Sequence, residues 1–349
     1  MSNKSSDQIE GMIPCPIHLI TSAFTKWTQL LYRAPPQYNG GYWKLSEHVG
    51  MPLPDILLED AVRVLVPYAE LSLPLIDGPF LAPIQTLPET HKEYAGLFYT
   101  ALLNTGKEER KLIIPKEVPP LCFWGYKLQK GYIDLYANSL YYVGYKAHGG
   151  SLNNYGMTLG EFCTLASGGE HINHGKVKHD FASLVTNGTY INKSDVQQFG
   201  QSASGGCLSN ESMCMHFAYG AYGNVLCINR GDVQKTFATG GDSGIYVNHK
   251  SVQEHLGWQR RGGICIDRGS SKDVACDASG GVYILYESPQ RVAYQARKEV
   301  CIITKSEQLM KDKSLADLVK KTEQKPDNIQ INDIIKKIAD HCKTAYRSQ

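Results

Sequence analysis

The stretch Thr239-Gly-Gly-Asp-Ser-Gly-Ile-Tyr-Val247 decides the fold that we predict from this sequence. It begins as a glycine turn and continues into an apolar run that is typical of a β-strand. Glycines on both sides of Ser243 allow a sharp turn, in which the backbone N–H groups of Gly241 and Ser243 can point at one spot. Such a turn suits a serine nucleophile if a base removes the hydroxyl proton and the N–H groups stabilise an oxyanion. The prediction therefore depends on a histidine and an aspartate upstream.

Both residues occur upstream in suitable settings. His148 follows an apolar run that begins near Ser139, and a glycine pair comes after it, so we expect it at the end of a strand. Asp180 opens another apolar run, where a half-buried carboxylate can fix the tautomer of a catalytic imidazole. The spacings are 180 − 148 = 32 and 243 − 180 = 63 residues. The chain order His, Asp, Ser differs from the orders of subtilisin and the α/β-hydrolases.

These segments resemble the motifs of chymotrypsin-like (trypsin-superfamily) serine proteases, and the short spacings resemble the compact viral members. The resemblance implies a double antiparallel β-barrel with a catalytic triad of His148, Asp180 and Ser243. It also implies an oxyanion hole formed by the N–H groups of Gly241 and Ser243, and no cofactor. Two later segments resemble the strands that line the specificity pocket and imply Ile264, Ile266 and Gly281 as pocket residues, and Phe237, six residues before Ser243, is implied at the pocket base. Phe237 at the pocket base implies an apolar or uncharged preference rather than cleavage after Lys or Arg.

Residues 175–181 show a weaker, local similarity to the poxvirus poxins, which are cyclic-dinucleotide nucleases thought to have a protease-like fold. In that family a tyrosine and a lysine after the aspartate act in catalysis. Phe181 and Val185 stand at the matching positions here, and neither can fill those roles. This similarity therefore supports the fold and speaks against nuclease activity.

Four other residues are alternatives for the site. His171, His174 and His179 fall in a stretch that glycines mark as a loop, so the first two are not predicted to pair on a helix as metal ligands. His179 stands directly beside Asp180, which is awkward for a base that this aspartate must orient. Cys207 is an alternative thiol nucleophile, but it follows Asp180 by only 207 − 180 = 27 residues. We expect loop histidines and no metal site.

The chain divides into three predicted regions. Residues 1–110 read as mostly helical, 111–304 as a chymotrypsin-like domain of many short strands, and 305–349 as a helical tail. We find no internal repeat in the sequence. The predicted fold class is mainly β: a chymotrypsin-like double antiparallel β-barrel with helical N- and C-terminal extensions.

Composition limits the class of protein. The 349 residues carry a net charge of +2, which gives no reason to propose a nucleic-acid or membrane surface. The polar N-terminus shows no signal-peptide pattern and no run is long enough to span a bilayer, so we predict a cytoplasmic protein, in the host cytoplasm if it is viral. We expect its ten cysteines to be reduced in that setting.

The function predicted from these observations is a serine endopeptidase that hydrolyses a polypeptide substrate. One alternative is a catalytically inactive protease-fold protein with a binding or structural role. In that case the tail face that carries Ile335 and Ile338 is expected to mediate self-association or a partner contact. A second alternative is a poxin-like cyclic-dinucleotide nuclease.

Overall fold

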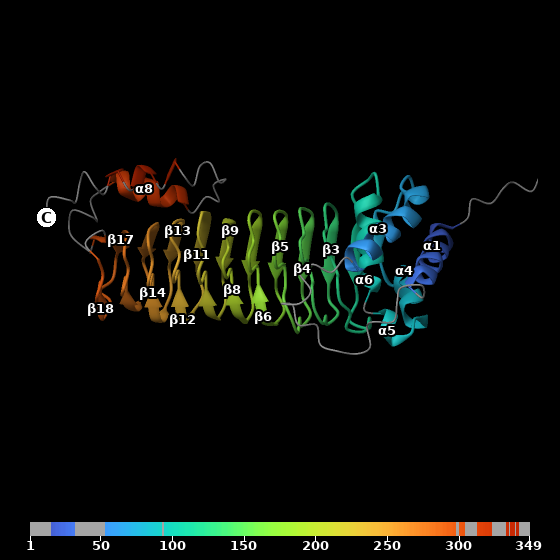
Figure 1. The fold of residues 1–349 in the computed structure, drawn as a ribbon, viewed down its shortest axis with the longest axis horizontal. Coiled ribbons are helices and arrows are strands. Elements are labelled where there is room, and N and C mark those ends of the chain that lie inside the picture. The colour runs from blue at the N-terminus through green and yellow to red at the C-terminus, as the bar shows by residue number, and fades with distance from the viewer. Residues whose placement is uncertain are drawn as a thin grey trace, which may run out of the picture.

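A computed structural model describes residues 15–31, 53–92, 94–297, 300–303, 313–322, 333–334, 336–338 and 340–341. Ile335 of the predicted tail face lies outside these residues. The described chain forms a long rod, a parallel β-solenoid of about ten turns with helices at its N-terminal end (Figure 1). No described helix has both the length and the apolar character needed to cross a membrane.

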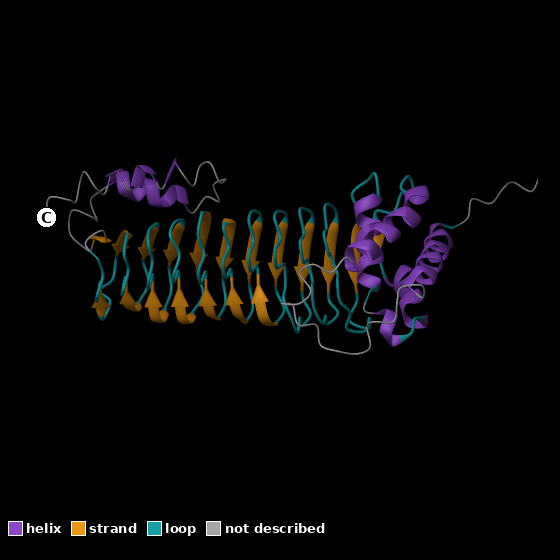
Figure 2. Cartoon of the chain, viewed as in Figure 1, coloured by secondary structure: helices purple, strands orange, loops and turns teal. Residues whose placement is uncertain are grey.

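The helices occupy the two ends of the chain, and the strands lie between them (Figure 2). The helical elements are α1 (Pro16–Leu31), α3 (Leu53–Leu65), η1 (Val66–Tyr68), α4 (Gly78–Leu81), η2 (Ala82–Thr86), α5 (Glu89–Lys92), α6 (Ala95–Thr105) and α8 (Lys313–Thr322).

Each solenoid turn from β5 to β18 contributes one strand to each of two sheets. The 12-stranded sheet contains, in spatial order, β1 (Leu75–Ile76), β2 (Lys111–Ile114), β3 (Tyr132–Leu135), β4 (Ser151–Asn154), β5 (Glu170–Asn173), β7 (Thr189–Asn192), β9 (Gly205–Asn210), β11 (Asn224–Asn229), β13 (Ile245–Asn248), β15 (Ile264–Asp267), β17 (Gly281–Leu285) and β19 (Val300–Ile303). The 7-stranded sheet contains β18 (Arg291–Val292), β16 (Ser271–Val274), β14 (Val252–Leu256), β12 (Val233–Phe237), β10 (Cys214–Phe217), β8 (Val196–Phe199) and β6 (Val177–Phe181).

This architecture overturns the predicted double barrel. The pairings between these strands are parallel, whereas a chymotrypsin-like barrel is antiparallel. The resemblance to chymotrypsin-like proteases is therefore wrong, and the similarity to poxins, which implied a protease-like fold, is wrong with it. Short apolar runs between glycine turns are equally compatible with hairpins and with solenoid turns, which explains the error.

The chain does contain a repeat, contrary to the prediction. A glycine with positive φ stands at the same corner of most turns, usually 19 residues after the last, as in 169 − 150 = 19. A Cβ at these corners would lie 2.5–3.2 Å from the carbonyl oxygen of the corner residue in the preceding turn, so glycine is required. The corner glycines are Gly131, Gly150, Gly169, Gly188, Gly206, Gly244, Gly263 and Gly281.

Two columns of identical side chains run through the interior. Buried asparagines of successive turns donate from Nδ2 to the next Oδ1 at 2.7–2.9 Å, and the column is Asn154, Asn173, Asn192, Asn210, Asn229, Asn248 and finally Asp267. A second column stacks phenyl rings with centroids 4.8–4.9 Å apart: Phe162, Phe181, Phe199, Phe217 and Phe237. The ring spacing matches the separation of paired strands, and at that separation each asparagine amide reaches the next one, so one residue type can contact its own copy turn after turn.

The N-terminal helices close one end of the rod. α6 is buried along most of its length and approaches the first turn so closely that a Cβ on Gly96 would lie 2.4 Å from the Cys122 carbonyl oxygen. Buried Arg110 joins the two parts by donating to the carbonyl oxygens of Leu102, at 2.7 Å, and Leu71, at 2.9 Å. These contacts satisfy backbone groups where helix meets strand, which anchors the cap to the solenoid.

The outer face of the 12-stranded sheet has two different halves. Over the C-terminal turns its outward side chains are apolar and pack against Leu318 of α8 and against Ile334 and Ile338. Figure 1 shows α8 lying along this part of the rod. Over the N-terminal turns the outward residues include Lys111, Asp134, Asn153 and Glu170. The same backbone thus presents an apolar surface covered by the tail and a more polar surface, on which charged and amide side chains alternate with isoleucines.

Candidate functional site

The solenoid separates the three residues of the predicted triad. His148 lies three residues before β4 and Ser243 lies two residues before β13, and these strands are five steps apart in the sheet. At about 4.8 Å per step, that is a separation of about 24 Å along the rod. Asp180 lies on β6 of the other sheet. His148 Nδ1 is 2.7 Å from Ser167 Oγ, and Ser243 Oγ donates to Asp242 Oδ1 at 3.1 Å, so no described hydrogen bond links the triad members.

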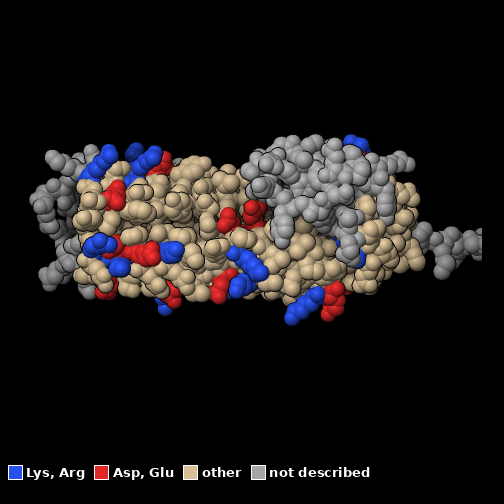
Figure 3. All heavy atoms as spheres, turned by 60° about the horizontal axis from the view of Figure 1, so that its bottom comes forward, with Lys and Arg blue, Asp and Glu red and all other residues tan. Residues whose placement is uncertain are grey.

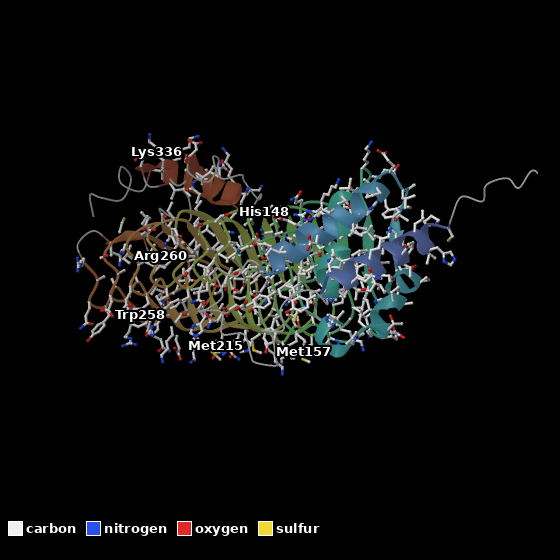
Figure 4. All side chains as sticks on the ribbon, turned by 45° about the vertical axis from the view of Figure 1, so that its right-hand side comes forward. His148, Met157, Met215, Trp258, Arg260 and Lys336 are labelled. Atoms are coloured by element: carbon white, nitrogen blue, oxygen red, sulfur yellow. The ribbon has the colours of Figure 1, made fainter. Side chains whose placement is uncertain are left out.

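The Gly241–Gly244 stretch is a solenoid corner that a buried arginine holds in place. Gly244 is one of the corner glycines, and a Cβ on Gly241 would lie 1.8 Å from the Ala221 carbonyl oxygen and 2.8 Å from Arg260 Nη1. Arg260 donates to the Ser243 carbonyl oxygen at 2.7 Å and lies 3.9 Å from the centre of the Tyr246 ring. Figure 4 shows Arg260 and His148 at well-separated positions along the rod. The glycines therefore accommodate the next turn of the solenoid.

The predicted pocket residues also occupy repeat positions. Phe237 is the last ring of the phenylalanine column and is fully buried. Ile264 and Ile266 point outward from β15 and are buried in the cluster that contains the tail residues Ile334 and Ile338. Gly281 is a corner glycine. The four predicted pocket residues are thus divided among the interior, the outer face and a corner.

The alternative residues are likewise spread over different positions. His171 is buried inside the rod beside the Gly168 carbonyl oxygen, at 2.9 Å, and burial lowers its pKa to about 4. His174 stacks on Tyr155. Within the described ranges, no group of three or more His, Cys, Asp or Glu side chains is arranged to hold a metal ion. The nine described cysteines, Cys207 included, form no disulfide.

A pocket of about 440 Å³ lies beside α3, α6 and the loop before β3. Its charged groups are paired: Asp55 accepts from Lys127 Nζ at 2.7 Å and from Tyr126 Oη at 2.9 Å, and Arg63 lies 3.8 Å from Glu59. The bonds of Asp55 to Lys127 and Tyr126 tie α3 to the solenoid, and the Arg63–Glu59 pair lies within α3. The pocket walls therefore have a structural explanation.

The polar half of the outer face carries a connected network on three neighbouring turns. Asp134 accepts from Lys111 Nζ at 2.6 Å on one side and from Asn153 Nδ2 at 2.8 Å on the other. The bond to Asp134 raises the pKa of Lys111. The Asp134 carboxylate is buried and accepts bonds from two neighbouring turns. These bonds hold the network in one arrangement and restrict the side chains around it.

Three large tyrosines surround this network and are exposed: Tyr132 by 43%, Tyr136 by 36% and Tyr155 by 40%. The rings of Tyr136 and Tyr155 are stacked at 4.6 Å, and His174 continues the stack at another 4.6 Å. Stacking on neighbouring turns restricts these side chains before any partner binds. Tyrosine is enriched at protein interfaces because it offers a large contact area and one polar tip.

On the face that Figure 3 shows, basic and acidic residues alternate and form small groups of mixed charge.

Comparison of the chain with protein-family models, with curated proteins and with solved structures finds no match. The candidate surface is therefore identified from its geometry alone. It consists of Tyr132, Tyr136 and Tyr155 around the Lys111–Asp134–Asn153 network. We call it the tyrosine surface. In the sequence, the only sign of this surface is the spacing of 19 residues between Tyr136 and Tyr155. That spacing indicates neighbouring side chains only once the repeat of the solenoid is known.

Proposed function

We propose that this protein is a binding protein that holds another polypeptide on its tyrosine surface. The observation that carries the proposal is the cluster of three exposed tyrosines on a rigid, hydrogen-bonded part of an otherwise regular sheet. In Figure 1 this part of the sheet lies between α8 and the N-terminal helices. Pre-ordered aromatic side chains favour binding because little conformational entropy is lost when a partner docks.

The partner class follows from the shape and chemistry of the surface. The outer face of a β-sheet is flat, its tyrosines offer both apolar rings and hydroxyl groups, and Lys111 and Glu170 supply one charge of each sign. Such a mixture suits a folded protein surface with apolar and polar patches better than it suits a highly charged polymer.

Affinity purification from the source cells tests the proposal. The variant combines Tyr132→Ser, Tyr136→Ser and Tyr155→Ser, and the matched control combines Tyr219→Ser, Tyr222→Ser and Tyr294→Ser, which are somewhat more exposed. We expect at least one protein that the wild type and the control retain and the first variant loses. Equal retention by both variants, or no retained protein at all, would contradict the proposal. Circular dichroism checks that both variants are folded.

Endopeptidase activity stays a prediction, now without the barrel that motivated it. A fluorophosphonate probe tests it directly, since it labels an activated serine. Labelling of the wild type that is lost in Ser243→Ala would restore the hypothesis. The hydrogen bond of Ser243 to Asp242 instead of to a histidine leads us to expect no specific labelling.

A further inference from the structure

Two carboxyl side chains from adjacent turns lie together on the side of the rod formed by the 7-stranded sheet. Phe162 pairs with Phe181 in a parallel bridge, so Glu161 and Asp180, which directly precede them, are register neighbours on the outward side. Their Cα atoms are therefore separated by about one strand spacing, roughly 4.8 Å. Two carboxylates this close repel each other unless a proton or a cation lies between them.

Among the described residues, three polar atoms near this pair are buried with no hydrogen bond of normal geometry: Glu161 Oε2, Thr164 Oγ1 and Ser183 Oγ, the last of which still interacts with Asp180. Thr164 and Ser183 are each only 4% exposed. Thr164 comes three residues after Glu161, and Ser183 comes three residues after Asp180. Ser183 is close enough to Asp180 to lower the pKa of that carboxyl against the larger, raising effect of burial. Unpaired buried polar atoms cost stability, and several in one place indicate a missing ligand.

Aromatic rings form one wall of the site. In the preceding turn, Tyr142 and Tyr145 hold the positions that Glu161 and Thr164 hold here, with ring centres 5.5 Å apart and planes at 86°. Phe123 stacks behind Tyr142 at 5.2 Å, and Tyr126 stacks behind Tyr145 at 5.9 Å. The columns thus change from large rings to small polar side chains at this turn. Two perpendicular tyrosine rings beside carboxylates are the surroundings that bind organic cations.

The electrostatics agree with this geometry. Burial, and then the charge of Asp180, raise the pKa of Glu161 to about 7. Glu161 in turn contributes to the raised pKa values of Tyr142 and Tyr145, and His179 opposes the effect of burial on Asp180. A cation between the carboxyl groups would remove their repulsion and drive Glu161 to release its proton.

We propose that Glu161, Asp180, Thr164 and Ser183 form a binding site for a guanidinium group, with Tyr142 and Tyr145 as its aromatic wall. A guanidinium has five N–H donors in one plane, which are enough for both carboxyl groups and the two hydroxyls, and it has a face that can stack on an aromatic ring. This site lies on the side of the 7-stranded sheet, whereas the tyrosine surface lies on the 12-stranded sheet. The proposed site does not depend on the function proposed for the tyrosine surface.

Calorimetric titration of the full chain with methylguanidinium tests this site. We expect saturable millimolar binding to the wild type and at least about tenfold weaker binding to Glu161→Gln and to Asp180→Asn, because each loses a charge-assisted contact. Thr164→Val, which keeps the shape and removes only the hydroxyl, should weaken binding by a few-fold. Glu170→Gln is the matched control on the other sheet and should bind like the wild type. Repeating the titration in buffers of different ionisation enthalpy should show proton release that Glu161→Gln abolishes.

Three results would overturn the proposal. The first is no saturable binding to the wild type up to tens of millimolar. The second is binding that Glu170→Gln weakens as much as Glu161→Gln does, which would indicate unspecific charge attraction. The third is binding of calcium but not of methylguanidinium, which would assign the site to a metal. Thermal unfolding of each variant separates loss of the site from loss of the fold.

Discussion

The two halves of the outer face differ although their backbones are the same: tail residues cover one half, and no described tail residue packs on the other, which we call the uncovered half. One outward column runs through both, and in the covered half it reads Ile228, Val247, Ile266, Ile284 and Ile303. In the uncovered half it reads Ile113, Asp134, Asn153, Ile172 and Ile191. The solenoid tolerates either pattern because its turns are held by interior contacts and backbone hydrogen bonds. Outward side chains are therefore free to decide what each half binds.

The largest loss of stability should come from placing a charge in this outward column. Val247→Asp buries an unpaired carboxylate beneath the tail, so we expect a loss of more than about 4 kcal/mol in the free energy of unfolding. Ile172→Asp, at the same column position in the uncovered half, should cost only about 1 kcal/mol. Urea unfolding of both variants measures the difference. Equal losses would show that the two halves do not differ in covering.

A change inside the rod should affect both halves alike. Asn210→Leu leaves Asn192 Nδ2 and Asn229 Oδ1 without partners, and we expect a loss of about 2–5 kcal/mol. Asn173→Leu breaks the same column beneath the uncovered half and should cost the same within about 1 kcal/mol. If the two losses differ by much more, the interior, and not only the outer face, distinguishes the halves.

Two carboxyl groups with raised pKa values, Asp267 under the covered half and Glu161 on the side of the 7-stranded sheet, should make the protein more stable in acid over overlapping pH ranges. Burial raises the pKa of Asp267, under the covered half, from 3.8 to about 6. Because the folded state holds this proton more tightly, stability is greatest below pH 3.8 and falls as the pH rises to about 6, by on the order of 3 kcal/mol. Glu161, with its pKa raised from 4.5 to about 7, acts with the same sign up to pH 7. Unfolding measured from pH 4 to 8 should lose the lower part of this slope in Asp267→Asn and the upper part in Glu161→Gln.

The smallest effect should come from the tyrosines at the rim of the sheet. Tyr155→Ser removes an exposed ring that stacks on Tyr136 and should cost less than about 1 kcal/mol. Tyr286 holds the same column position in the covered half, packs against the apolar cluster and lies 5.5 Å below the Arg268 guanidinium. Tyr286→Ser should therefore cost about 1 kcal/mol more than Tyr155→Ser. Thermal unfolding of both variants ranks them, and the reverse ranking would count against the tail as a cover.

Several features were predictable from residues alone, and others were misread. The abundance of glycine turns and short apolar runs predicted a mainly β chain, and strands do follow these glycines. The interpretation of Gly241–Gly244 as a nucleophile turn failed because a corner glycine and an oxyanion-hole glycine satisfy the same backbone requirement. The repeat escaped notice because its length varies between 18 and 20 residues, as in Phe181 to Phe199 and Phe217 to Phe237.

The residues alone fix where the chain turns and which residue types return, since glycines and alternating apolar residues act through local geometry. Parallel pairing of each strand with the next turn is visible only in the folded chain, because local patterns do not encode which strand is the neighbour. That choice places Asn beside Asn and Phe beside Phe, sets Ser243 about five strand spacings, roughly 24 Å, from His148, and brings Glu161 next to Asp180. Contacts between turns, and not the motifs within one turn, therefore define the sites of this protein.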